Sequence, residues 1–118
     1  MLEDVITVAE TAEFLGDVKE LLTEEQHDAL VLYVAHNPRS GEVIPETGGL
    51  RKLRWAAKGR GKRGGSRVIY YFHSNSHPLL LMAIYSKSAK SDLTPADRKA
   101  LAAEVSGLKR QWKQRKAT

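Results

Sequence analysis

The sequence predicts an α+β domain: a mostly antiparallel sheet with helices against one face, in the order strand-helix-helix-strand-strand-strand-helix. The chain has 118 residues, which suits one core, so we assign residues 1–118 to a single domain. Residues 11–38 carry apolar side chains at helical spacing, whereas residues 50–87 are dominated by alternating β-type stretches. The composition, 42% hydrophobic and 28% charged, is that of an ordinary globular protein.

The first part of the chain predicts one strand and two helices. Residues 4–10 are expected to form a short strand, and residues 11–22 the first helix. A second helix is predicted over residues 23–38, which open on Thr23 with Gln26 three residues later. This pairing is typical of a capping box, in which each side chain binds the backbone of the other residue.

The middle of the chain predicts three strands, over residues 50–57, 67–73 and 79–87. Before them, residues 39–49 form a loop with a brief edge strand at Val43–Ile44. The short turn between the second and third of these strands requires them to be antiparallel. Pairing in sequence order gathers cationic and phenolic side chains on the sheet face without helices. They are Lys52, Arg54, Arg67, Tyr71, Tyr85 and Lys87.

Alternation within the last strand assigns its side chains to two faces. Leu80, Met82 and Ile84 are expected on one face, opposite Ala83 and Tyr85. A register slip of one residue would reverse each of these assignments.

Residues 93–112 predict the last helix. Thr94 can cap it, and Pro95 suits its first position because proline lacks the backbone N–H that a first turn leaves unused. Asp92 and Asp97 are interpreted as capping residues of this helix. The basic tail that follows is expected to fray.

Charge is divided unevenly along a chain whose net charge is +5. Residues 1–50 carry eleven acidic and two basic side chains, a net −9, and residues 51–118 carry seventeen basic and three acidic ones, a net +14. The stretch from Arg51 to Phe72 holds eight Lys or Arg and no acid. This asymmetry favours a surface that faces a polyanion, with a solvated basic face as the plainer alternative.

Two familiar motifs do not apply. The glycines of "GRGKRG" have GxGxxG spacing, but a strand follows them, whereas a dinucleotide-binding loop leads into a helix. A phosphate-binding P-loop fails as well, because "GK" is followed by Arg63 and not by Ser or Thr. A long hairpin loop is the better interpretation, either following a nucleic-acid backbone or simply solvated. Its cations are Lys58, Arg60, Lys62 and Arg63.

We expect no metal, no cofactor and no membrane partner. His73 and His77 have no cysteine or carboxylate nearby to complete a metal site. The chain has no cysteine, no apolar run long enough to span a bilayer and an acidic rather than basic start. These features predict a cytoplasmic protein.

A site made of cations and phenols suits RNA cleavage by attack of the 2′-hydroxyl on the adjacent phosphate. Fixed Arg or Lys charges stabilise the doubly negative phosphorane of the transition state. A lysine whose pKa is lowered by neighbouring cations can accept the proton. Tyr71 or Tyr85 could stack on a base, or lie in the core.

Three segments carry a resemblance to known proteins. They are "TGGLRKLRW" (Thr47–Trp55), "GKRGGSRVIYYF" (Gly61–Phe72) and "IYSKSAKSDLTPADRKAL" (Ile84–Leu101). These segments resemble the RelE/HigB superfamily of bacterial type II toxins, specifically its HigB-like branch. With the order of elements, the resemblance extends over nearly the whole chain.

The resemblance implies a fold, an activity and partners. Such proteins have a RelE-like, microbial-ribonuclease-like α+β fold. They are small cytoplasmic endoribonucleases, most of which cleave mRNA in the ribosomal A site and thereby inhibit translation. A cognate antitoxin, often a helix-turn-helix protein, neutralises them, and the complex binds operator DNA to repress its own operon. We therefore expect a ribosome-dependent mRNA interferase.

The resemblance also implies roles for particular residues. Lys52 and Arg54 occupy the basic strand after the paired glycines, and Arg67 matches the arginine that begins the next strand. Arg54 and Arg67 are expected to hold the scissile phosphate. Lys87 or Lys52 is expected to be the general base.

After the last strand, RelE has an arginine and then a tyrosine where this chain has Ser88 and Thr94. Lys87 and Lys90 are the candidates to replace the missing charge. A wider set of side chains is expected to bind the RNA: Lys58, Arg60, Lys62, Arg63, Tyr71, Tyr85 and Lys90.

Two alternatives stay open at this point. A toxin of the same fold could act on DNA gyrase, as ParE relatives do, and would stop growth without cleaving transcripts. A catalytically inactive nucleic-acid-binding module would use every basic residue for phosphate contacts alone.

Overall fold

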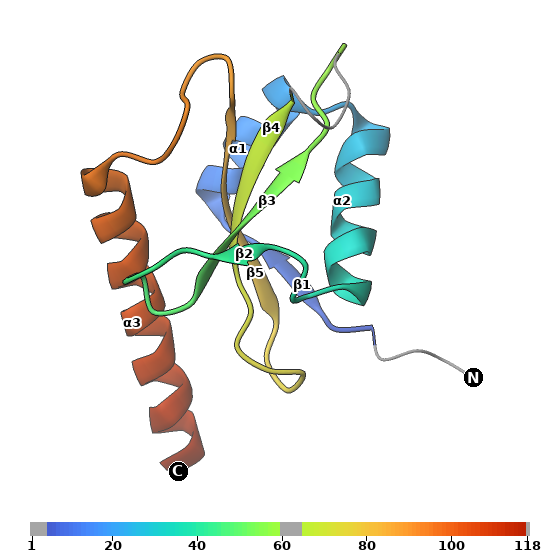
Figure 1. The fold of residues 1–118 in the computed structure, drawn as a ribbon. Coiled ribbons are helices and arrows are strands. Elements are labelled where there is room, and N and C mark those ends of the chain that lie inside the picture. Colours follow the sequence, from blue (N-terminus) through green and yellow to red (C-terminus); the bar gives the residue numbers. More distant parts are fainter. Residues whose placement is uncertain (1–4, 60–64, 118) are drawn as a thin grey trace.

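The structure is a computed structural model that describes residues 5–59 and 65–117, the last two of these by their backbone alone. The described part of the chain is an α+β fold with one mixed five-stranded sheet and three helices (Figure 1). Its elements in chain order are β1 (Val8–Glu10), α1 (Ala12–Leu21), α2 (Glu24–His36), β2 (Glu42–Val43), β3 (Leu50–Trp55), β4 (Ser66–Tyr71), β5 (Leu79–Ser86) and α3 (Pro95–Ala117).

The sheet has the strand order β1-β5-β4-β3-β2. β2, β3, β4 and β5 pair antiparallel in sequence order, whereas β1 pairs parallel with β5. The prediction of a mostly antiparallel sheet is therefore correct for three of the four strand pairs. The predicted order of elements omitted β2, which is only two residues long and pairs Glu42 with Lys52.

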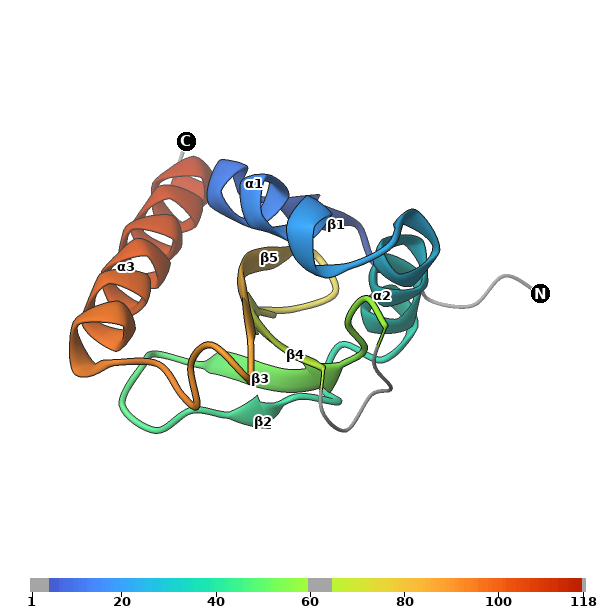
Figure 2. The same ribbon diagram turned by 90° about the horizontal axis from the view of Figure 1, so that it is seen from above.

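Helices cover both faces of the sheet, so the prediction of helices against one face is wrong. α1 and α2 lie on one face, and α3 lies on the other (Figure 2). The reason lies in β4, whose six residues are all buried. Ile69 and Tyr71 of β4 point to the face opposite α1 and α2. There they pack in one apolar cluster with Leu101 and Val105 of α3.

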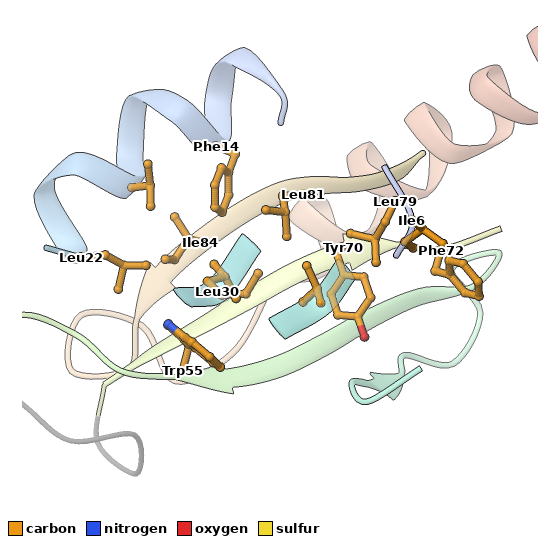
Figure 3. Packing of buried hydrophobic residues seen from close by; sticks show 13 residues of the cluster. Ile6, Phe14, Leu22, Leu30, Trp55, Tyr70, Phe72, Leu79, Leu81 and Ile84 are labelled. Atoms are coloured by element: carbon orange, nitrogen blue, oxygen red, sulfur yellow. The ribbon is translucent and has the colours of Figure 1, made fainter. Parts of the chain in front are cut away.

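The larger core lies between the sheet and the first two helices (Figure 3). Phe14 of α1 and Leu30 of α2 are completely buried, and they pack against Val68 and Tyr70 of β4. Both helices begin at the predicted caps: Thr11 accepts a hydrogen bond from Phe14 N, and the Thr23 capping box is present. The predicted spacing therefore identified both helices and most of their buried residues, although Leu15, which was predicted in the apolar stripe of the first helix, is 40% exposed.

A β-bulge changes the faces of β5. Ile69 pairs with Ala83 and Tyr70 with Leu81, so Met82 has no partner of its own in β4. As a result Met82 lies on the α3 face together with Ala83, and Ile84 lies in the opposite core. The predicted grouping of Ile84 with Met82 is therefore wrong.

α3 begins at Pro95 as predicted but continues to Ala117, five residues beyond the predicted end at 112. Thr94 Oγ1 accepts from Asp97 N, and Asp97 Oδ2 accepts from Thr94 N, so the two residues cap the helix reciprocally. None of the helices in the described part of the chain is long and apolar enough to cross a bilayer.

Candidate active site

A cleft of about 440 Å³ opens on the part of the α3 face that α3 leaves uncovered. Strand register builds it: Arg54 of β3 stands opposite Arg67 of β4, which stands opposite Tyr85 of β5. Residues directly opposite one another share a face, so this row projects to the same side as Lys52. The cleft is lined by Ser40, Glu42, Lys52, Leu53, Arg54, Arg67, Lys87 and Ser91.

Arg67 is the most buried charged group of the cleft, with 6% of its surface exposed. Its Nη1 donates to the carbonyl oxygen of Ser66 at 3.2 Å, and no carboxylate of the described residues forms an ion pair with it. Its cross-strand neighbour is a second guanidinium, that of Arg54. Like charges directly opposite repel, and a buried charge without a counter-ion is costly, so this pair favours an anion between or above them.

Lys52 is held at the edge of the cleft by Asp92. The Lys52 Nζ lies 3.3 Å from Asp92 Oδ1, and Arg98 approaches the other carboxylate oxygen at 3.6 Å. The N–H of Leu93, followed by Lys52 and Arg98, holds the pKa of the Asp92 carboxyl below its usual range. Asp92 therefore stays charged and neutralises part of the cationic row, instead of capping α3 as the sequence suggested.

Tyr85 lies beside the arginine row with its hydroxyl 3.5 Å from Asp92 Oδ1. Burial first and the charge of Asp92 second raise the pKa of the phenol to about 12, against the opposing influence of Arg67. The phenol keeps its proton at neutral pH. Its hydroxyl donates to Asp92, and Tyr85 is not among the described residues that line the cleft.

The two lysines after β5 have different surroundings. Lys87 is exposed, lines the cleft and has no ion pair with a described carboxylate. Lys90 instead forms an ion pair of 2.7 Å with Asp97 at the start of α3, and its ammonium lies 5.6 Å from the Tyr85 ring centre. Lys90 does not line the cleft, so of the two candidates to replace the missing arginine, only Lys87 has a free charge there.

Some predicted RNA-binding residues lie elsewhere. Tyr71 is 3% exposed beneath α3, where its ring stacks on Trp112 at 6.3 Å and its hydroxyl contacts His73 Nδ1 at 2.9 Å. This placement corresponds to the core alternative and leaves no free ring face for a base. The Lys58 ammonium donates to the Lys19 carbonyl at the end of α1, away from the cleft. The loop cations Arg60, Lys62 and Arg63 lie outside the described residues.

The sequence analysis missed Glu42, the one carboxylate among the described residues that line the cleft. The predicted edge strand was placed one residue too far along, at 43–44 instead of 42–43. With the observed register, Glu42 stands opposite Lys52 and therefore faces the cleft. Ser40 and Ser91 were missed because neither lies in a strand whose alternation could place it.

The described residues contain no group of three or more His, Cys, Asp or Glu side chains able to hold a metal ion. What the cleft offers is guanidinium, ammonium and hydroxyl donors, which bind phosphate or carboxylate groups. No known protein-family model matches this chain.

Proposed function

We propose that this protein is a RelE/HigB-like toxin of a type II toxin-antitoxin system, acting as a ribosome-dependent mRNA endoribonuclease. The element order, the antiparallel β2–β5 unit and the helix pair on one face support a RelE-like fold. The cleft supports the activity, because four of its lining residues are the cations expected to act on RNA. They are Lys52, Arg54, Arg67 and Lys87.

The observation that carries the proposal is the buried Arg67 opposite Arg54. A structural arginine at this depth is normally paired with a carboxylate. This guanidinium has no such partner among the described residues and lies in an open cleft. A phosphate diester fits these two guanidinium groups. Each guanidinium can donate two parallel hydrogen bonds to the oxygens of a phosphate.

The same arrangement fits the proposed reaction. As the 2′-oxygen attacks, the negative charge on the phosphate oxygens grows from one to two. Fixed hydrogen-bond donors therefore stabilise the transition state more than the ground state. Arg67 and Arg54 supply those donors. Lys52 is engaged with Asp92, so Lys87 is the lysine available for proton transfer.

The ribosome would align the substrate. Two of the four cations that line the cleft, Arg54 and Lys87, are exposed, so we expect an RNA strand to need a partner that holds it in an in-line geometry. Alignment by a partner can supply several kcal/mol of the barrier. The cognate antitoxin would neutralise the protein, and operator DNA would be bound only through that complex.

The test is induced expression with mapping of mRNA 5′ ends. We expect growth arrest with new 5′ ends inside translated reading frames, and none when translation is blocked beforehand. Replacing Arg67 with Met removes the charge but keeps the bulk, and should lower cleavage by about 10²–10³-fold, the usual loss for one transition-state donor.

Arg110→Met is the matched control, because Arg110 is an exposed residue of α3 outside the cleft. It should cleave at the wild-type rate. Arrested cells with intact transcripts would overturn the nuclease and favour a gyrase-directed toxin of the same fold. Tolerated overexpression would favour an inactive binding module.

A further inference from the structure

Among the described residues that line the cleft, Glu42 is the one carboxylate, and the others are cations, serines and one leucine. It belongs to the two-residue edge strand β2 and stands opposite Lys52 in β3. Side chains of directly opposed residues lie about 5 Å apart at Cβ and on the same face of the sheet. Glu42 therefore points into the same space as the arginine row.

Buried groups fix the backbone that carries Glu42. The N–H of Gly41 donates to the Tyr70 hydroxyl at 2.8 Å, and the Gly41 carbonyl accepts from Arg51 Nη1 at 2.8 Å. A Cβ at position 41 would lie 2.8 Å from the Tyr70 ring, so only glycine permits this approach. Tyr70 is completely buried, so the loop is anchored to the core one residue before Glu42.

The other side of β2 is held as well. Thr47, which is 2% exposed, donates to the Ile44 carbonyl at 2.6 Å and accepts from Leu50 N at 3.1 Å. These bonds close the loop between β2 and β3. Such a short edge strand would fray without these anchors, and a catalytic group needs a fixed position.

The two carboxylates near the cleft differ in their partners. Asp92 has Lys52, Arg98 and the N–H of Leu93. Glu42 faces Lys52 in the register, yet the Lys52 ammonium reaches Asp92 instead, and Glu42 has no ion pair with a described residue. Because the Lys52 ammonium forms its ion pair with Asp92, the Glu42 carboxylate stays available as a proton acceptor.

We propose that Glu42 is the general base of the RNA cleavage, a role that rests on the proposed function. A carboxylate is ready to accept a proton at neutral pH, whereas a lysine must first lose one. Glu42 is therefore the base in place of the lysines that the sequence suggested, and Lys87 becomes the acid.

The step balances as follows. The 2′-oxygen forms a bond to phosphorus as its proton passes to the Glu42 carboxylate. The bond between phosphorus and the 5′-oxygen breaks, and the Lys87 ammonium gives that oxygen a proton. The products are a 2′,3′-cyclic phosphate and a 5′-hydroxyl, and solvent then returns the proton from Glu42 to Lys87.

The test is a single-turnover cleavage of mRNA on purified bacterial ribosomes, with binding to the ribosome measured separately. Glu42→Gln keeps the size and polarity of the side chain but cannot accept the proton. It should lower the first-order rate at least about 100-fold, the contribution of a general base, with unchanged ribosome affinity. Glu46→Gln, an exposed carboxylate of the same loop outside the cleft, is the matched control and should cleave normally.

The pH profile separates a glutamate from a lysine base. With a glutamate base, the wild-type rate should be nearly constant between about pH 6 and 8. A rate that rises about tenfold per pH unit over that range would overturn the inference in favour of a lysine. A Glu42→Gln enzyme that cleaves at the wild-type rate while Arg67→Met does not would also overturn it and leave the proposed function intact. Intact mRNA with wild-type protein would instead reject the function itself.

Discussion

The two ends of one sheet face differ in what covers them. At one end Leu50, Ile69 and Met82 are buried against Leu101 and Val105 of α3. At the other end, Arg54 and Arg67 stand opposite each other and line the open cleft. Along β4, only Val68 separates the apolar contact of Ile69 from the guanidinium of Arg67, which has no ion pair with a described residue.

The difference shows how one small sheet can combine a core with a reactive surface. The covered end stabilises the fold by burying apolar area. It also fixes the start of α3, where Asp92 pairs with Lys52 and Asp97 pairs with Lys90. These carboxylates neutralise Lys52 and Lys90 but leave Arg54, Arg67 and Lys87 without ion pairs among the described residues. The residual charge is therefore concentrated at one point.

Removing an apolar contact from the covered end should give the largest effect on stability. Leu101 is 5% exposed in the core under α3, so Leu101→Ala loses transfer energy and leaves a cavity. We expect the free energy of unfolding to fall by about 3 kcal/mol, measured by urea denaturation. Cleavage by the folded fraction should persist, because the sheet and not α3 supplies the arginine row.

Leu32→Ala is the matched control for this prediction. Leu32 is 61% exposed on the outer side of α2, so the same truncation should change stability by less than about 0.5 kcal/mol. Equal losses at the two positions would mean that the α3 contact does not form as described.

The ion pair at the start of α3 should give a smaller effect that depends on pH. The Lys90 ammonium, followed by the hydrogen bonds from Thr94, lowers the pKa of Asp97 to about 2, from an ordinary value of 3.8. A depressed pKa adds stability that is fully present above about pH 4 and is lost as the pH falls toward 2.

Asp97→Asn should therefore lower the urea midpoint at pH 5 and have little effect at pH 2. Asp28→Asn, an exposed residue of α2 without a described ion pair, should change the midpoint little at either pH. A difference at Asp97 that stays the same at both pH values would contradict the ion pair.

Local patterns predicted much of this arrangement, because alternation and capping depend only on neighbouring residues. The strand of Arg67 and Ile69 was assigned to the correct faces, and the caps at Thr23 and Thr94 are present. The side on which α3 packs could not be predicted, since an apolar stripe does not specify which face it covers. Nor could the bulge at Met82, which depends on pairing with another strand.

The candidate site was predictable in its cations but not in its carboxylates. Arg54 and Arg67 come from regular strands, so their common face followed from period two. Glu42 and Asp92 lie in short or irregular segments, where the direction of a side chain is set by long-range anchors such as the Tyr70 hydroxyl. Those anchors lie up to forty residues away in sequence from the groups they position.

The most direct test of the central claim is the free energy of unfolding of Arg67→Met beside the wild type, in a buffer free of phosphate and sulfate. A buried guanidinium that faces Arg54 without a counter-ion costs stability, so its removal should raise the free energy of unfolding by about 1 kcal/mol. A fall of about 2 kcal/mol or more would contradict the account, because Arg67 would then be a satisfied structural residue and the cleft would have no unpaired charge at its centre.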